Sequence, residues 1–424
     1  MRPSSSHPAA HDPSRARRTA SPAATGWAGV GVGCLAAWMT LPPLAVRSPL
    51  VPVALGAVTV GLGALALSQR AARPGTAAIV VGILGAVLGW AATRSSVDNL
   101  ESVVVWSALL PATLRSATPL IFAAIGGLFS ERSGVANIGL EGMMLTGALF
   151  GILGAEQTGS WQVGLAAGVA AGGLLALLLA VFSIHLRADQ IVSGTAVNFI
   201  ALGLTGFVLI DVYGQEGIPA NVPEIPSVDL GVLARAFGWL AELPLVGSLF
   251  GLLGAVFGDL NLMIWAALIA VAASWFVLFK MPIGLRIRAV GEHPGAADTV
   301  GISVYGVRYA SVVVSGMLAA AGGAYLSIGF VGSFNENMTA GRGFIALAAL
   351  IFGNWRPLGA AAACLLFAFS SAVAQRLDVY SASAGLPLDV LFQALPYVLT
   401  LIAVAGVIGR SIPPAAVGRP YKKQ

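Results

Sequence analysis

The stretch that decides the fold is WQVGLAAGVAAGGLLALLLAVFSI, residues 161–184, which carries no charged side chain. A helix needs about 20 apolar residues to cross the hydrocarbon core of a bilayer, so these residues predict a transmembrane helix. The chain as a whole has the same character, because 57% of its 424 residues are hydrophobic and only 10% are charged. Soluble domains average about 45–50% apolar and about 25% charged residues, so the composition excludes a soluble globular protein.

Apolar runs of similar length recur along the chain and predict an all-α, polytopic membrane protein with about 10–12 transmembrane helices. The candidate spans are residues 27–46, 50–68, 76–92, 104–130, 135–154, 161–184, 191–213, 262–280, 305–329, 341–354, 357–375 and 388–409. A further apolar stretch, 236–258, is interrupted by Glu242, Pro244 and several glycines. We interpret it as interfacial or loop material.

The charged residues predict how these helices are oriented. Residues 1–24 hold four Arg among Ser, Pro and His, and we interpret them as a disordered tail that stays in the cytoplasm. With the amino end inside and an even number of crossings, 17 of the 23 Lys and Arg residues fall on the inner side. We therefore expect both termini in the cytoplasm, with residues 413–424 as a second tail. The net charge of +5 reflects this asymmetry and not a nucleic-acid surface.

The sequence lacks the motifs of a membrane enzyme. Its lysines, Lys280, Lys422 and Lys423, belong to no G-x-x-x-x-G-K-[ST] phosphate-binding loop, and no G-x-S-x-G nucleophile motif occurs. His7 and His11 lie in a Pro-rich tail without a Glu between them, which argues against a metal site. We expect a transport protein that is not an enzyme and has no cofactor. The competing class is a secondary transporter or channel that acts alone, which would need ionisable residues in the middle of its spans.

Three polar segments interrupt the apolar pattern. The first is ERSGVANIGLEGMM, residues 131–144, whose three glycines permit backbone that is not helical. Asn137 and Glu141 are four residues apart and would share one face of a helix. The segment is either a broken helix that lines a pathway or a cytoplasmic turn in which Asn137 caps a helix. The spacing alone does not decide between the two.

The other two polar segments lie in the second half of the chain. Residues 280–302 are too polar to insert, and Pro294 and Gly301 can begin and end a short helix there. This segment is either a docking element for a cytoplasmic partner or a basic loop that fixes the topology. Asn335-Glu336-Asn337 precedes the short apolar stretch 341–354, which indicates either a second broken helix or a plain extracellular loop.

At these segments the sequence resembles the permease subunits of ABC importers for ribose-type sugars and branched-chain amino acids, in particular the nucleoside and simple-sugar branch. The matching stretches are ERSGVANIGLEGMMLTGA at 131–148, ADQIVSGTAVNFIALGLTGF at 188–207, GLRIRAVGEHPGAADTVGI at 284–302 and AGRGFIALAALIFGNWRPLGA at 340–360. They occur in the family's order. The resemblance implies a type II ABC importer-like transmembrane domain with broken helices at residues 103–412, preceded by additional transmembrane helices at residues 25–102.

The resemblance also implies a function and partners. Such a chain forms half of the translocation pathway of an ATP-driven importer, here for a nucleoside or, as the second choice, a simple sugar. It pairs with a second, homologous permease subunit, which we expect to give a heterodimer. It binds ABC ATPase subunits and receives substrate from an extracytoplasmic substrate-binding lipoprotein. We expect it in the bacterial plasma membrane, in contact with membrane lipid and not with nucleic acid.

Two groups of functional side chains follow from the resemblance. The translocation pathway is expected to involve Asn137, Glu141, Asn198 and Asn335. Coupling to the ATPase is expected through a cytoplasmic helix near residues 291–302, with Arg286, Gly291, Glu292, His293, Pro294 and Ala297. His293 stands where the family more often has Asn, so its imidazole is given no special role.

Overall fold

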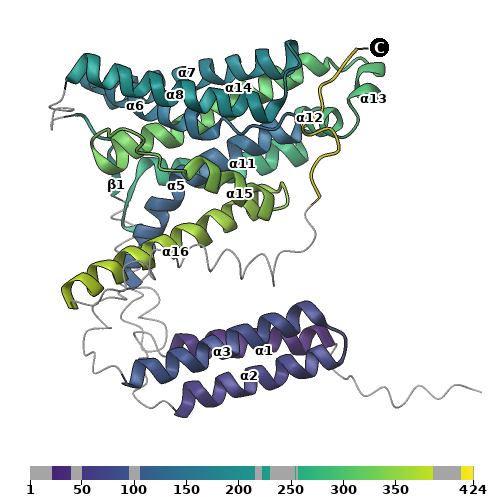
Figure 1. The fold of residues 1–424 in the computed structure, drawn as a ribbon, viewed down its shortest axis with the longest axis vertical. Helices are drawn as coiled ribbons and strands as arrows, with labels where there is room; N and C mark the ends of the chain where they lie inside the picture. The colour runs from purple at the N-terminus through teal and green to yellow at the C-terminus, as the bar shows by residue number, and fades with distance from the viewer. Residues whose placement is uncertain are drawn as a thin grey trace, which may run out of the picture. The chain divides into compact units, whose positions relative to one another are not determined.

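A computed structural model describes residues 22–39, 50–94, 106–214, 222–229, 254, 256–384 and 412–423. The chain divides into two compact units, Met1–Ser102 and Val103–Gln424. The first unit packs three helices together, α1 (Pro22–Met39), α2 (Leu50–Ser68) and α3 (Ala72–Arg94) (Figure 1). A Cβ built on Gly56 of α2 would lie 2.7 Å from the carbonyl oxygen of Gly82 in α3. Glycine thus lets these backbones approach closely, as in other membrane helix pairs.

In its described residues, the second unit is a helical bundle with one short two-stranded ladder. In chain order its elements are α5 (Trp106–Arg132), α6 (Leu140–Thr158), α7 (Trp161–Ala180), η1 (Val181–His185), α8 (Gln190–Tyr213), β1 (Ser227–Asp229), β2 (Asp259–Asn261), α11 (Leu262–Lys280), α12 (Pro282–Glu292), α13 (Pro294–Thr299), α14 (Val304–Tyr325), η2 (Leu326–Val331), α15 (Arg342–Phe352) and α16 (Pro357–Ala384). The π-helical turns η1 and η2 continue α7 and α14. β1 and β2 are antiparallel, with Ser227 opposite Asn261.

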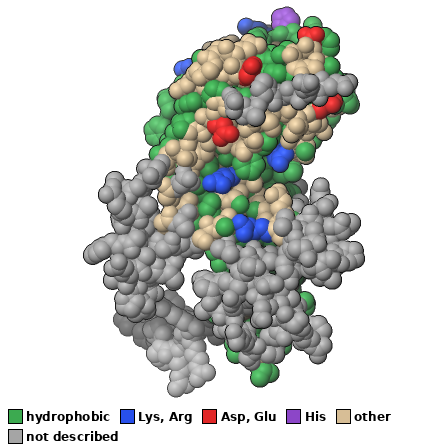
Figure 2. Space-filling model, turned by 90° about the vertical axis from the view of Figure 1, so that its left-hand side faces the viewer, with side chains coloured by type: hydrophobic (Ala, Val, Ile, Leu, Met, Phe, Trp, Pro, Cys, Tyr) green, Lys and Arg blue, Asp and Glu red, His purple; other side chains and the backbone are tan. Residues whose placement is uncertain are grey.

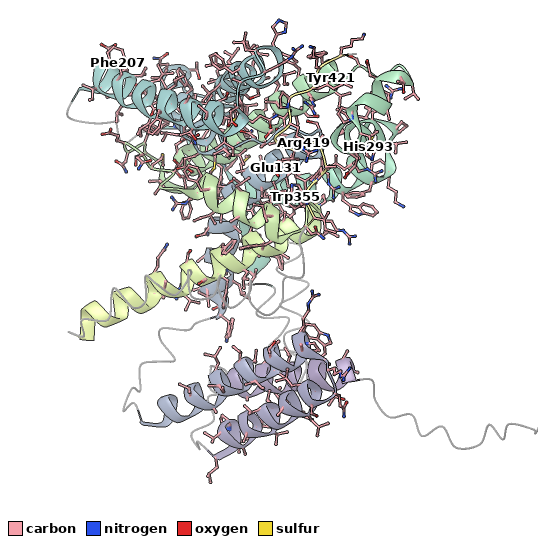
Figure 3. The ribbon with its side chains drawn as sticks, turned by 45° about the vertical axis from the view of Figure 1, so that its right-hand side comes forward. Glu131, Phe207, His293, Trp355, Arg419 and Tyr421 are labelled. Carbon is pink, nitrogen blue, oxygen red and sulfur yellow. The ribbon has the colours of Figure 1, made fainter. Side chains whose placement is uncertain are left out.

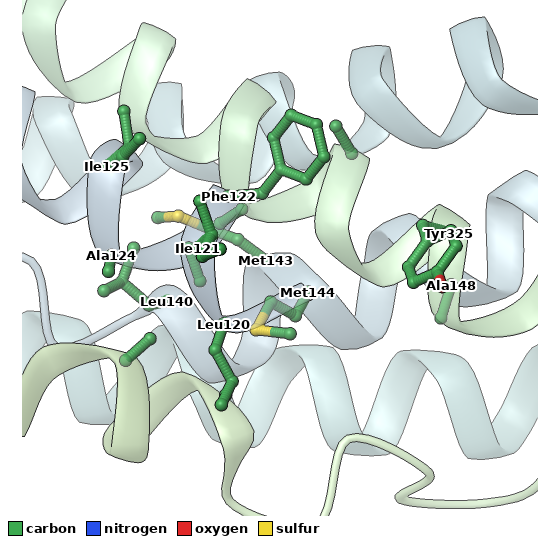
Figure 4. Close-up of a cluster of buried hydrophobic side chains, with 14 of the residues drawn as sticks. Leu120, Ile121, Phe122, Ala124, Ile125, Leu140, Met143, Met144, Ala148 and Tyr325 are labelled. Carbon is green, nitrogen blue, oxygen red and sulfur yellow. The ribbon is translucent and has the colours of Figure 1, made fainter. Parts of the chain in front are cut away.

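The core of the second unit lies where α5, α6, α7 and α14 pack together, and Figure 4 shows part of it. Met143, Met144 and Tyr325 have no exposed surface there. A Cβ on Gly323 of α14 would overlap the main-chain carbonyl of Met144 in α6. The two helix backbones are therefore in direct contact, and a larger residue at this position would separate them.

The outer surface of the second unit is strongly apolar. Phe199 and Phe207 of α8 expose 70% and 67% of their surface, and Ile269 of α11 exposes 67%. Figure 2 shows hydrophobic side chains with only scattered charged groups on the face that it draws. Large apolar side chains exposed in this way suit contact with lipid or with another membrane subunit.

Seven of the described helical segments are long and apolar enough to cross a membrane. They are Leu50–Ser68, Trp106–Arg132, Trp161–His185, Gln190–Tyr213, Leu262–Lys280, Val304–Val331 and Pro357–Arg376. The predicted all-α, polytopic fold is confirmed. The predicted spans 50–68 and 262–280 coincide with α2 and α11 from end to end.

Two of the predicted spans need correction. The run 341–354 contains the 11-residue helix α15, which is about 16 Å long at 1.5 Å per residue and cannot cross a bilayer by itself. The run 135–154 begins as irregular backbone, and its helix α6 starts only at Leu140. The predicted span 388–409, most of the stretch 236–258 and most of the tail 1–24 lie outside the described residues.

Candidate functional site

The backbone between α5 and α6 leaves the helical path while it is buried. Gly134 has a φ of +90°, which glycine adopts without the steric penalty that a Cβ imposes. Val135 and Asn137 have no exposed surface. The Ser130 hydroxyl donates to the carbonyl of Val135 at 2.7 Å. Since buried amides and carbonyls need partners, the rest of this break must be stabilised by neighbouring helices.

Amide side chains supply these partners. On α8, Gln190 Oε1 accepts from the amide of Ala136 at 2.7 Å. Asn198, two turns further along, donates to the carbonyl of Ile138 at 3.0 Å and accepts from the amide of Gly142 at 2.8 Å. One polar stripe on α8 therefore holds both sides of the break.

Asn137 holds the break from inside. Its Oδ1 accepts from the amide of Gly139 at 3.0 Å, and its Nδ2 donates to the Ser315 hydroxyl of α14 at 2.8 Å. The side chain is thus a cap for the turn before α6 and also a bridge to a helix of the second half of the chain. Each hydrogen bond of Gln190, Asn198 and Asn137 named here is shorter than 3.2 Å, so the irregular backbone of the break has well-formed partners.

Glu141, in the first turn of α6, joins the break to the loop before α15. Its Oε1 accepts from the Thr339 hydroxyl at 2.6 Å and from the amide of Gly341 at 2.8 Å, and its Oε2 accepts from the amide of Gly343 at 2.6 Å. Gly341 is the N-cap of α15. A carboxylate at this position satisfies free helix amides and complements the positive end of the helix dipole. We refer to Glu141, Thr339, Gly341 and Gly343 as the carboxylate clamp.

A second junction joins the end of α5 to the turn between α15 and α16. The indole N–H of Trp355 donates to the Glu131 carboxylate at 2.5 Å. The Arg132 guanidinium donates to the main-chain carbonyl of Trp355 at 2.7 and 3.0 Å. Asn354 and Trp355 have φ values of +53° and +52°, which non-glycine residues seldom adopt. The contacts with α5 therefore hold an unfavourable turn in place.

The two short helices α12 and α13 form a compact projection at one end of the bundle, where Figure 3 shows His293. Arg286, Glu292 and His293 are exposed. Gly291 is buried, and a Cβ on it would overlap the carbonyl oxygen of Arg132. Ala297 is also buried, in a small core with Val290 and Val304. The projection thus presents charged groups outward while its glycine packs directly on the turn that leads into the break.

The structure brings three of the four predicted pathway residues together. Asn137, Glu141 and Asn198 surround the break between α5 and α6, whereas Asn335 is exposed in the loop four residues before Thr339. The six predicted coupling residues all lie on α12, α13 or the residue between them. Gln190, Ser315, Thr339 and Trp355 are additional site residues that the motifs did not single out. Gln190 alone carried a signal, as an uncharged polar group at the start of an apolar helix.

Comparison with known proteins identifies the family. The family model described as branched-chain amino acid transport system / permease component matches residues 109–404. The chain is 41% identical over 331 residues to the guanosine ABC transporter permease protein NupQ of Bacillus subtilis, covering 76% of this chain and 99% of that protein. It is 40% identical over 313 residues to the nucleoside ABC transporter permease protein NupC of Lactococcus lactis, covering 72% and 94% of the two chains.

A further relative carries the name of a sugar permease. The chain is 38% identical over 281 residues to the putative glucose ABC transporter permease protein TsgC13 of Haloferax volcanii, covering 66% of this chain and 80% of that one. No solved structure matches the chain. The family match extends over most of the second unit, including the break, the carboxylate clamp and the projection. The chain therefore belongs to the branched-chain amino acid transport system permease family and is a membrane-spanning ABC transporter permease.

Proposed function

We propose that this chain is the permease subunit of an ATP-driven nucleoside importer and forms half of its translocation pathway. The observation that carries the proposal is the match to a guanosine permease over 99% of that protein's length at 41% identity. A simple sugar is the second candidate substrate, because a relative of 38% identity is named a putative glucose permease.

The geometry supports different tasks for the four pathway residues. Asn137 and Glu141 are buried, and their hydrogen bonds are used to hold broken backbone. We infer that they shape the pathway and do not bind substrate directly. Asn198 is half-buried, and its side-chain amide also holds the break. Asn335 is exposed, so its polar group is available to a passing polar solute. The break and the loop before α15 move together if they move, because the carboxylate clamp joins them.

The geometry of the projection supports two different roles for the predicted coupling residues. Arg286, Glu292 and His293 are exposed and can contact an ATPase subunit, with Pro294 as the first residue of α13. Gly291 and Ala297 are buried and fix the two helices to the bundle. A push on the projection would reach the turn at Arg132 through Gly291, since the two backbones touch.

We further propose the setting in which the chain works. It lies in the bacterial plasma membrane with both termini in the cytoplasm and pairs with a second, homologous permease. ATP hydrolysis takes place on separate ATPase subunits, and a substrate-binding lipoprotein delivers the nucleoside. The alternative, a transporter or channel that acts alone, would need no ATPase.

Uptake of radiolabelled guanosine by cells that express the importer tests this function. We expect uptake that disappears when the ATPase subunit is left out and that excess unlabelled nucleoside, but not glucose, inhibits. Glu292→Gln should lower ATPase co-purification and uptake, whereas Asp211→Asn, which neutralises an exposed carboxylate on α8, should change neither. Uptake that persists without the ATPase and collapses with an ionophore would support the stand-alone transporter.

A further inference from the structure

Residues 412–423, which include most of the predicted cytoplasmic tail 413–424, lie against the projection as an ordered segment that we call the C-terminal strap. The amide of Ala416 donates to the carbonyl of Gly291 at 2.9 Å. The amide of Ala415 donates to the Glu292 carboxylate at 3.2 Å. Two consecutive amides of the strap are therefore bound to the last two residues of α12.

The same strap also contacts the parts of the bundle that flank the projection. The amide of Ile412 donates to Asn354 Oδ1 at 3.2 Å, in the turn that Glu131 and Arg132 hold. Ala416 is 5% exposed, and a Cβ on Gly134 would lie 3.3 Å from its methyl group. The strap thus touches both α12 and the turn at the start of the break.

The end of the strap is fixed to α13 and α14. The ring of Tyr421 packs edge-on against Tyr305 with 5.8 Å between ring centres, and it also packs against the small core that contains Ala297 of α13. Partial desolvation and the Asp298 carboxylate both raise the pKa of Tyr421, because they favour the neutral phenol. Figure 3 shows Arg419 and Tyr421 at the same end of the bundle as Glu131 and His293.

Beneath the strap lies a buried cation. Arg308 of α14 is 1% exposed, and its Nη1 donates to the carbonyl of Arg419 at 3.2 Å. Among the described residues, its Nε and Nη2 have no hydrogen-bond partner. A buried guanidinium with free donors is costly, so the one carbonyl that the strap supplies matters for keeping this end of α14 in place.

We propose that the C-terminal strap is a positioning element for transport, which makes the projection and the break between α5 and α6 move as one body. The inference rests on the coupling role proposed above for α12 and α13. With the strap in place, Gly291 is held between the carbonyl of Arg132 and the amide of Ala416. Without the strap, Gly291 would keep only the contact with Arg132 of these two, and α12 and α13 could tilt without displacing the turn at Arg132. ATPase binding would survive, because Arg286, Glu292 and His293 stay exposed beside the strap, whose hydrogen bond to Glu292 comes from a single main-chain amide. The motion, however, would be lost.

The test compares Tyr421→Ala and a deletion of residues 412–424 with the wild-type complex and with a control, Lys422→Ala/Lys423→Ala, whose side chains are exposed. The complex with both permeases and the ATPase is purified, and hydrogen–deuterium exchange of residues 282–299 is measured. Both strap variants should retain the ATPase, and exchange in this segment should be about tenfold faster, as for the loss of one or two hydrogen bonds. The control should match the wild type.

Uptake and ATP hydrolysis are then measured on the same samples. We expect guanosine uptake to fall about tenfold while ATP hydrolysis continues, so that more ATP is consumed per molecule imported. Unchanged exchange, or uptake within about twofold of the wild type in both strap variants, would overturn the proposal. Loss of the ATPase from Tyr421→Ala would also overturn it, since the strap would then build the docking site. A failure of the proposed function would look different, because the wild-type complex itself would then not import guanosine or retain an ATPase.

Discussion

Replacing Glu141 by Ala removes the centre of the carboxylate clamp. The change leaves the Thr339 hydroxyl and the amides of Gly341 and Gly343 without their acceptor. A buried donor left unpaired costs about 1–3 kcal/mol, whereas polar pairs between membrane helices average about 0.6 kcal/mol. Three such donors give an expected loss of roughly 2–9 kcal/mol in the free energy of unfolding.

Two milder substitutions should destabilise the protein less than Glu141→Ala does. Glu141→Gln keeps one oxygen for Thr339 and Gly341 but turns an NH2 group toward the amide of Gly343, so about 1–3 kcal/mol is expected. Thr339→Val removes one donor and one hydrogen bond, and we expect about 1 kcal/mol. Glu336→Gln is the matched control, because this carboxylate is exposed in the same loop, and its effect should stay within about 0.5 kcal/mol.

Denaturant titration of the purified protein in mixed micelles measures these differences, with guanosine uptake by the assembled importer as the second readout. The midpoints should fall in the order Glu336→Gln, Thr339→Val, Glu141→Gln, Glu141→Ala, from least to most destabilised. If Glu141→Ala unfolds at the same denaturant concentration as Glu336→Gln, the clamp does not join the two halves as described. A stable Glu141→Ala protein with normal uptake would refute the reasoning completely.

Three further substitutions test other contacts of the site. Gly291→Ala should lower uptake about tenfold, because its Cβ would push α12 off the carbonyl of Arg132, and Gly295→Ala, which meets nothing within 4 Å, should not. Trp355→Phe leaves the buried Glu131 carboxylate without its indole donor and should cost about 1–3 kcal/mol in the same titration, more than Glu131→Gln, which keeps an acceptor for the indole. Gln190→Leu removes the acceptor of the Ala136 amide and should lower the free energy of unfolding by about 1–3 kcal/mol. Equal denaturation midpoints for mutant and wild type would contradict this.

Much of the fold followed from hydropathy, because a long apolar run in a bilayer has few alternatives to a helix. The spans at 50–68 and 262–280 were located to the residue for this reason. Hydropathy failed at 341–354, where the apolar run reached the length of a short span but contained only the half-length helix α15. The left-handed turn at Asn354 and Trp355 ends it, and neither residue type signals a positive φ reliably.

The contacts of the site were less accessible to sequence reasoning. Gly134 and Gly139 correctly indicated irregular backbone after Arg132, whereas Gly142 lies within α6. The spacing of Asn137 and Glu141 left a broken helix and a simple turn equally open. Glu141 binds two main-chain amides 200 and 202 residues away. Every residue except proline has a main-chain amide, so the residue types at these positions did not indicate the contact. The strap was not predicted for the same reason, because Ala415 and Ala416 bind α12 through their main-chain amides.

The central claim is that this chain imports a nucleoside only when an ATPase drives it through α12 and α13. The most direct measurement is guanosine uptake into proteoliposomes that contain the two permeases, the ATPase and the binding protein, with ATP supplied on the side of the projection. We predict uptake with ATP, none with a non-hydrolysable analogue and no effect of an ionophore. Uptake by the permeases alone, or uptake that an ionophore abolishes while ATP is present, would contradict the account.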